Sequence, residues 1–135
     1  MIKRIKKTDK EWKEGLTRKQ YQIMRKRKTE KPFSGKYVNF NKKGSFHCAG
    51  CGNRLFSSEA KFEPDELNRG WASFYEPVEN ERVEYREDLS HYLHRIEVVC
   101  AKCGCHLGHV FDGGPKPTGK RYSINSASLI FFPEK

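Results

Sequence analysis

The sequence lacks the long apolar segments that membrane-spanning and secreted chains carry. No run approaches the ~18 apolar residues that a membrane-spanning helix needs, and the mean hydropathy is -0.88. The N-terminus is charged from Lys3 onward and has no apolar core of a signal peptide. We therefore expect a cytoplasmic protein whose five cysteines stay reduced. In such a compartment, paired cysteines bind metal more often than they form disulfides.

Acidic residues are scarce at the start of this 135-residue chain, whose length predicts one domain. Residues 1–31 hold 13 lysines and arginines against 4 acidic residues, whereas residues 32–135 hold 14 against 13. The formal charge of +10 is thus almost wholly N-terminal. Such a cluster can attract nucleic acid, but charged runs often form only a solvated helical face. We expect no nucleic-acid partner.

Two helix signals occur in this basic segment. Thr8-Asp9-Lys10-Glu11 and Thr17-Arg18-Lys19-Gln20 both have the form of a capping box. They predict helices over about 9–14 and 18–27, with Gly15 ending the first. The apolar contacts of these helices are expected from Trp12, Leu16, Tyr21 and Met24.

Beyond Pro32 the pattern changes to short β-type runs broken by glycine, asparagine and proline. No helical pattern separates these runs, which favours antiparallel sheets. The charged stretch 79–88 is expected to form an exposed hairpin or turn. We predict a mainly β domain over 32–135, with the helical segment 1–31 packed on it. The expected strands lie near 37–40, 45–48, 74–78, 94–99, 109–111 and 122–132.

One internal repeat indicates a metal site. Cys48-Ala49-Gly50-Cys51-Gly52 matches Cys100-Ala101-Lys102-Cys103-Gly104, so two Cys-x-x-Cys pairs are each followed by glycine. This spacing lets one turn aim two thiolates at one ion, and the glycine tolerates the left-handed conformation of such a turn. Four thiolates suit zinc and leave no open position for a substrate. The repeat therefore predicts one structural zinc ion, held by Cys48, Cys51, Cys100 and Cys103.

Residues able to do acid–base chemistry directly follow the second cysteine pair. His106 and His109 precede Asp112, and a Gly/Pro-rich loop then leads into the run Arg121-Tyr122-Ser123-Ile124-Asn125. Imidazoles are the side chains most often used for proton transfer near neutral pH. A candidate active site therefore follows the second predicted metal-binding turn in the sequence.

Motifs spread over nearly all of the chain after residue 15 carry a resemblance to a known family. They are Leu16-Thr17-x-x-Gln20-Tyr21, Pro32-Phe33-Ser34-Gly35-Lys36-Tyr37, Leu55-Phe56-Ser57-Ser58, Gly70-Trp71-Ala72-Ser73-Phe74-Tyr75, Glu97-Val98-Val99-Cys100, His106-Leu107-Gly108-His109-Val110-Phe111-Asp112 and Arg121-Tyr122-Ser123-Ile124-Asn125-Ser126-Ala127-Ser128-Leu129. In this order they resemble the B-type methionine sulfoxide reductases, which reduce the R epimer of methionine sulfoxide. The resemblance implies two antiparallel sheets, one zinc on the two cysteine turns and an open site on a sheet surface. It also implies a monomer acting on methionine-R-sulfoxide in peptides or proteins, with a thioredoxin-like or other thiol as reductant.

The resemblance also implies roles for single residues. Trp71 matches a tryptophan that packs on the methyl group of the substrate. His106 and His109 match histidines that position water or the sulfoxide oxygen and help its protonation. Arg121 and Asn125 match residues that set the charge and hydrogen bonding around the nucleophile. Further candidates for substrate binding are Phe111, Asp112 and His91.

Ser123 stands where the family carries its catalytic cysteine, so catalysis is in question. Sulfoxide reduction needs a nucleophile that takes up the oxygen as a sulfenic acid, a state that a serine hydroxyl does not have. We expect this chain to bind the substrate and to have lost all or most turnover. The serine is either an engineered change or a natural variant, and in the second case Cys105 is the replacement candidate. Arg69 and Ala72 also depart from the family's usual cysteine and proline.

Two other classes of function stay open. A non-catalytic zinc-containing module that binds oxidised methionine is consistent with Ser123 and Arg69. A zinc-ribbon protein that binds nucleic acid is consistent with the basic N-terminus, but it gives no reason for Trp71 or the two histidines. The reductase family is therefore the leading hypothesis.

Overall fold

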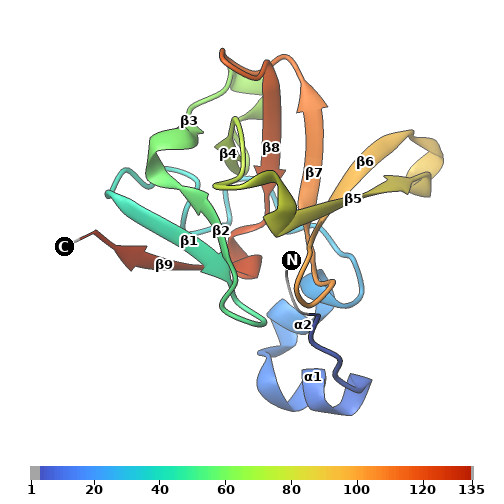
Figure 1. The fold of residues 1–135 in the computed structure, drawn as a ribbon. Coiled ribbons are helices and arrows are strands. Elements are labelled where there is room, and N and C mark those ends of the chain that lie inside the picture. Colours follow the sequence, from blue (N-terminus) through green and yellow to red (C-terminus); the bar gives the residue numbers. More distant parts are fainter. Residues whose placement is uncertain (1–3, 135) are drawn as a thin grey trace.

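In the computed structural model, which describes residues 4–134, the chain forms two antiparallel sheets with two short helices at one end (Figure 1). The smaller sheet has the strand order β2-β1-β9, and the larger has the order β3-β4-β8-β7-β6-β5. The mainly β fold predicted from the sequence is thus confirmed.

The strands are β1 (Gly44–Cys48), β2 (Arg54–Ser57), β3 (Lys61–Phe62), β4 (Ala72–Phe74), β5 (Val83–Asp88), β6 (Arg95–Cys100), β7 (His106–Asp112), β8 (Lys120–Ile124) and β9 (Leu129–Pro133). Single 3-10 turns are η1 (Ser58–Ala60), η2 (Glu66–Asn68), η3 (Asn80–Arg82), η4 (Ser90–Tyr92) and η5 (Ser126–Ser128).

Helices α1 (Asp9–Gly15) and α2 (Arg18–Met24) begin where the capping boxes predicted. The Thr8 hydroxyl accepts from the backbone N–H of Glu11 at 3.2 Å, and the Glu11 carboxylate accepts from the N–H of Thr8 at 3.0 Å. The predicted end of the second helix at residue 27 is wrong. Arg27 has φ 60°, a left-handed conformation that stops the helix and turns the chain. Within residues 4–134, no helix has both the length and the apolar character to cross a membrane.

The two helices share the core of the sheets. Trp12, Tyr21 and Met24 are buried, and they belong to one hydrophobic cluster with residues of both sheets. The guanidinium of Arg25 lies over the Trp12 ring, 5.0 Å from its centroid, so part of the N-terminal positive charge takes part in packing. Residues 1–3 of the predicted basic segment lie outside the described residues. The division of the chain at residue 31 stays a prediction.

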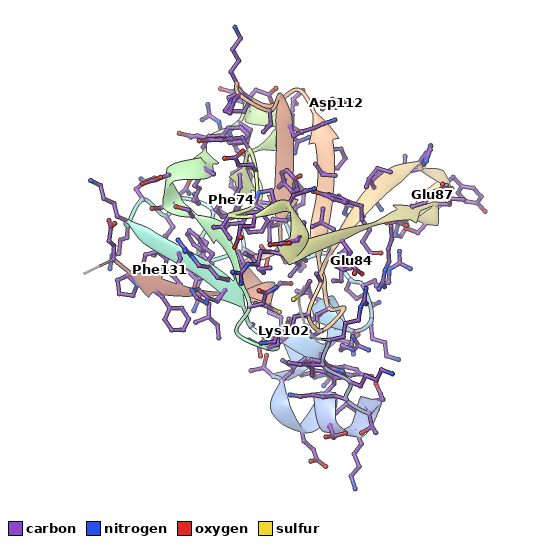
Figure 2. All side chains as sticks on the ribbon, viewed as in Figure 1. Phe74, Glu84, Glu87, Lys102, Asp112 and Phe131 are labelled. Atoms are coloured by element: carbon purple, nitrogen blue, oxygen red, sulfur yellow. The ribbon has the colours of Figure 1, made fainter. Side chains whose placement is uncertain are left out.

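Three phenylalanines join the sheets. Phe74 of β4 stacks on Phe56 of β2 at 4.4 Å between ring centroids and meets Phe46 of β1 edge-on at 5.2 Å. All three rings are fully buried, and Figure 2 shows Phe74 in the interior between the sheets. Because side chains alternate along a strand, Ser73 beside Phe74 projects from the opposite face of the larger sheet. That opposite face is the one available for a site.

Several predicted strand boundaries are wrong. Residues 37–40 form a turn rather than a strand, and the predicted strand 74–78 is instead β4, which ends at Phe74. The stretch 79–88, expected to be a hairpin or turn, contains β5, whose exposed charged residues face water at the sheet edge. The predicted strand 122–132 breaks into β8 and β9, which belong to different sheets. The sequence reading also missed the short strands β2 and β3.

Candidate active site and metal centre

The four predicted zinc ligands come together between the β1–β2 turn and the β6–β7 turn. The sulfur atoms of Cys48, Cys51, Cys100 and Cys103 all lie within 4.8 Å of one another. Cys48 lies 3.6 Å from Cys103, and Cys51 lies 3.6 Å from Cys100. Tetrahedral zinc with bonds of about 2.3 Å places its sulfurs about 3.8 Å apart, so the donor set fits one zinc ion. The predicted structural zinc site is confirmed in its ligands and their arrangement.

Packing four thiols together has an electrostatic cost that a cation removes. Without one, hydrogen bonds from Cys103 and its neighbours lower the pKa of Cys100, whereas the hydrogen bond with Cys100 raises the pKa of Cys48 well above its usual value. One sulfur can therefore ionise at the expense of the others. A divalent ion stabilises all four thiolates at once, and it would clamp the smaller sheet to the larger one.

The candidate catalytic residues lie on one face of the larger sheet. In the strand register, Ser123 of β8 is directly opposite His109 of β7 and Ser73 of β4, and His109 is opposite Glu97 of β6. Directly opposed residues of antiparallel strands project from the same face. Ser123 is half-buried, whereas the other three are buried. The sheet thus sets an acid, an imidazole and two hydroxyls in one row.

Phe111 and Arg121 lie two positions from His109 and Ser123 on the same strands, so they project from the same face. The guanidinium of Arg121 lies over the Phe111 ring, 4.5 Å from its centroid. This cation–π contact holds Arg121 two residues before Ser123. Trp71 and Asn125 lie directly outside β4 and β8, so strand alternation does not place them, and hydrogen bonds to the backbone of Glu30 hold both side chains.

Each site histidine is held by a buried carboxylate. Nδ1–H of His106 donates to Glu97 at 2.6 Å, and Nε2–H of His109 donates to Asp88 at 2.7 Å. Burial lowers the pKa of His109, although Asp88 opposes this. Burial raises the pKa of Asp88, but the hydrogen bonds from His109 and Ser90 outweigh it, so this pKa lies well below its usual value. Both rings are thus fixed in orientation, with His109 favoured as the neutral imidazole.

A single arginine joins the two carboxylates. Nη2 of Arg27 lies 3.2 Å from Glu97 and 3.5 Å from Asp88. Arg95 adds a second cation, with Nη2 3.5 Å from Asp88. Burial raises the pKa of Glu97, but His106 and Arg27 together hold it below its usual value. The left-handed turn at Arg27 therefore brings a charge from the N-terminal segment to the base of the site.

The carboxylate of Glu30 caps the turn that follows β8. It accepts from the backbone N–H groups of Ser126 at 2.9 Å and Ala127 at 3.1 Å. Glu30 is 4% exposed, and a Cβ at Gly35 would collide with its carboxylate. These bonds bend the chain after Asn125, so β8 and β9 enter different sheets.

The backbone of Glu30 positions two more site residues. Its carbonyl accepts from the indole N–H of Trp71 at 3.0 Å, and its N–H donates to the side-chain oxygen of Asn125 at 3.1 Å. The amide of Asn125 also donates to the Leu107 carbonyl at 3.1 Å. Asn125 thus links the N-terminal segment to β7, with one amide hydrogen left for other partners.

The structure does not bring every predicted residue to this group. Asp112 lies one residue beyond Phe111, so it points to the opposite face, and it pairs with Lys120 at 2.6 Å. His91 is exposed in the loop after β5. Cys105, the alternative nucleophile, is 0% exposed and packs against the metal-binding turn near Gly50.

Sequence reasoning missed four residues that organise the site, namely Arg27, Glu30, Asp88 and Glu97. A signal for Glu97 was present, since it interrupts the apolar run Ile96-Glu97-Val98-Val99. A buried acid needs a partner, so the run indicates a cation or imidazole nearby. Arg27 and Glu30 gave no such signal, because they lie in a segment where charge is common.

Fold and site together define a metal-binding β domain that carries an acid–base face. The family model described as the SelR domain matches residues 16–133. The peptide methionine sulfoxide reductase MsrB of Methanosarcina barkeri is 51% identical over 133 residues, which cover 98% of this chain and 92% of the relative. The protein of the same name from Leptospira interrogans is 49% identical over 130 residues, covering 96% and 97%. The chain belongs to the SelR family of MsrB-type peptide methionine sulfoxide reductases.

Proposed function

We propose that the Trp71–His109–Ser123 face binds methionine-R-sulfoxide in peptides or proteins, and that Ser123 blocks its reduction in this chain. A register shift between β6 and β7 brings the ring of His106 beside that of His109, with 5.4 Å between their centroids. The observation that carries the proposal is the Nε2 atom of His106, which is buried and has no hydrogen-bond partner within residues 4–134. Its Nδ1 is fixed by Glu97 at 2.6 Å. An unpaired buried polar atom is costly. A water would satisfy it in the neutral ring by donating to Nε2, and a sulfoxide oxygen would satisfy it in the protonated ring by accepting from Nε2–H.

The chemistry of the face agrees with a sulfoxide ligand. The Trp71 ring supplies an apolar surface for the methyl group, and His106 in its protonated form can donate its Nε2–H to the polarised oxygen while Nδ1–H stays on Glu97. A thiolate at position 123 would attack the sulfur, take the oxygen as sulfenic acid and release methionine. A serine hydroxyl cannot be oxidised in this way. With serine at position 123, we therefore expect the chain to bind the sulfoxide without reducing it.

If position 123 were cysteine, an external thiol would have to reduce the sulfenic acid. Four of the five cysteines share the metal site, and Cys105 is fully buried. Arg69 pairs with Glu63 at 3.2 Å and supplies no thiol. We propose a thioredoxin-like or small dithiol reductant, which forms its own disulfide and releases water. We also propose that the protein is monomeric and cytoplasmic and that it has no nucleic-acid partner.

A second candidate function is a non-catalytic module that binds oxidised methionine and releases it unchanged. Ser123 favours this alternative, since the rest of the face keeps the residues that the family resemblance implies. In that case binding would be the biological activity. The serine would then be a natural feature rather than a disabling substitution.

The test compares the chain with Ser123→Cys on R-sulfoxide and S-sulfoxide peptides. Excess dithiol is supplied, and methionine is followed by mass spectrometry. Turnover of the R epimer only, and only by Ser123→Cys, is the expected result. Ser123→Ala is the matched control and should remain inactive. Turnover by the unchanged chain would contradict the argument about oxygen, and inactivity of both with retained binding would favour the binding module.

A further inference from the structure

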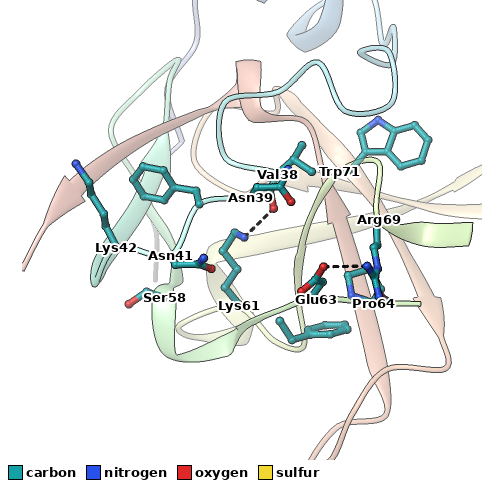
Figure 3. A pocket seen from close by; sticks show the side chains of 12 residues that line it. Val38, Asn39, Asn41, Lys42, Ser58, Lys61, Glu63, Pro64, Arg69 and Trp71 are labelled. Atoms are coloured by element: carbon teal, nitrogen blue, oxygen red, sulfur yellow. Dashed lines mark hydrogen bonds and ion pairs between the residues drawn. The ribbon is translucent and has the colours of Figure 1, made fainter. Parts of the chain in front are cut away.

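A pocket lies beside the proposed sulfoxide site and shares Trp71 with it. It has a volume of about 260 Å³ and lies between the loop 38–42 and the segment that begins with β3. Figure 3 shows Trp71 and Arg69 at one side of this pocket and Lys61 inside it. A ligand that rests on Trp71 can therefore extend into the pocket without crossing the sheet.

The pocket is lined by more positive than negative charge. Three cations, Lys42, Lys61 and Arg69, face one acid, Glu63. Glu63 is already paired with Arg69 at 3.2 Å. The lining therefore keeps an excess of positive charge, carried by two lysines. Such a lining favours an anionic ligand group.

Lys61 is the central feature of this pocket. Its ammonium group donates to the Val38 carbonyl at 3.2 Å, and no carboxylate of residues 4–134 lies within ion-pair distance of it. The side chain is half-buried, and this burial lowers the pKa of Lys61. An ammonium group has three donors, so two remain for a ligand. Glu63 opposes this lowering of the pKa from beyond ion-pair distance, so the partly desolvated ammonium group gains most from an anion that enters the pocket and contacts it directly.

We propose that this pocket is a subsite for a carboxylate of the substrate, supplied by an aspartate or glutamate near the methionine sulfoxide. The inference rests on the proposed function, because Trp71 connects the two sites. A carboxylate fits better than a phosphate, since Glu63 at the rim repels a doubly charged group more strongly. A C-terminal carboxylate has the same chemistry, and the experiment separates it from a side chain.

The chain as it stands suits an equilibrium test, because Ser123 prevents turnover in the proposed function. Binding is measured by calorimetry for capped five-residue peptides with central methionine-R-sulfoxide and either glutamate or glutamine at each flanking position. A third set ends in a free carboxylate instead, and the same peptides with unoxidised methionine are the reference. At low salt, glutamate in at least one position should tighten binding about five- to tenfold. The preference should shrink as salt is added.

Variants of Lys61 decide whether the pocket is responsible. Lys61→Met should remove the glutamate preference and leave affinity for the glutamine peptide unchanged, whereas Lys61→Arg should keep it. Lys10→Met, at an exposed position of α1, is the matched control. A preference that survives Lys61→Met, or that never appears, overturns the subsite.

Two arms of the same experiment separate the remaining outcomes. A gain only with the free terminal carboxylate assigns the subsite to chain ends. Sulfoxide peptides that bind better than methionine peptides, without a carboxylate preference, overturn the subsite alone. Sulfoxide peptides that bind no better than methionine peptides overturn the proposed function and the subsite with it.

Discussion

Arg27 makes a two-point contact with the buried carboxylate of Glu97. Its Nη2 lies 3.2 Å from one carboxylate oxygen, and its Nε donates to the other at 3.2 Å. The Arg27 side chain is 52% exposed, whereas that of Glu97 is 2% exposed. A surface cation thus offsets a buried acid whose other partner is His106. Through this pair, an arginine of the N-terminal segment helps to lower the pKa of Glu97.

The first prediction concerns Arg27→Gln. Removing this cation leaves Glu97 and Asp88 less compensated, so the pKa of Glu97 rises and protonated His109 becomes easier to form. The pKa of His109 should rise, and the rise should be small because the arginine is partly exposed. NMR titration of the imidazole signals measures it in the unchanged chain and in the variant. Arg27→Lys should show a smaller shift, and an unchanged His109 titration would refute the coupling.

The second prediction concerns acid stability. The folded pKa of His109 is lowered from 6.5, so folding stability decreases as pH falls below about 6.5. The pKa values of Asp88 and Glu97 are lowered in the folded protein from 3.8 and 4.5. Both carboxylates therefore stabilise the fold fully above these unfolded values, and this stabilisation is lost as pH falls through the folded pKa values. Urea midpoints from pH 8 to 3 should therefore fall in two steps.

Asp88→Asn tests the lower step. The variant should be less stable at pH 7, because Arg27 and Arg95 lose a partner, but its further loss below pH 4 should be smaller. Glu14→Gln, at an exposed position of α1, is the control. Parallel pH profiles for the unchanged chain and Asp88→Asn would contradict the assignment to Asp88.

The third prediction concerns Glu30→Gln. The amide keeps one acceptor but turns its NH₂ group toward the N–H groups of Ser126 or Ala127, so a buried donor loses its partner. Unfolding free energy should fall by about 2 kcal/mol, as measured by urea denaturation. Emission of Trp71 in a Trp12→Phe background should also change, because the turn at Glu30 holds its indole N–H. Glu59→Gln on the surface is the control, and equal effects of the two changes would contradict the capping role.

The parts of the fold that could be predicted from sequence are those fixed by local chemistry. Both capping boxes predicted their helices because Thr8 and Thr17 act within one turn. The two Cys-x-x-Cys turns predicted the metal centre because thiolates at that spacing have few other uses. These features depend on neighbouring residues or on strongly constrained chemistry.

The missed features depend on contacts between distant residues. The Glu30 carboxylate accepts a hydrogen bond from the backbone N–H of Ser126, 96 residues away. This contact bends the chain and so divides the predicted strand 122–132. Arg27 is 70 residues from Glu97, and no local pattern pairs them. The exposed strand β5 looked like a charged turn because it packs on one side only. Such errors arise where tertiary contacts override the local pattern.

The last prediction concerns metal removal. Zinc is expected at one ion per chain, because the four sulfurs lie within 4.8 Å of one another and form a closed set. Cys51→Ser should lower zinc content and destabilise the contact between the sheets, since the remaining thiols cannot all ionise without the ion. Zinc content by atomic emission and near-UV circular dichroism measure both effects.

Cys105→Ser is the matched control, because Cys105 packs against the metal-binding turn without belonging to the four-sulfur group. It should keep one zinc per chain, although burying a hydroxyl there costs roughly 1–3 kcal/mol. Strong chelation should abolish the near-UV signal of the unchanged chain and of Cys105→Ser alike. Loss of zinc in Cys105→Ser, or full zinc in Cys51→Ser, would contradict the ligand set. A near-UV signal that survives complete zinc removal would instead show that the phenylalanine contacts between the sheets suffice without the metal.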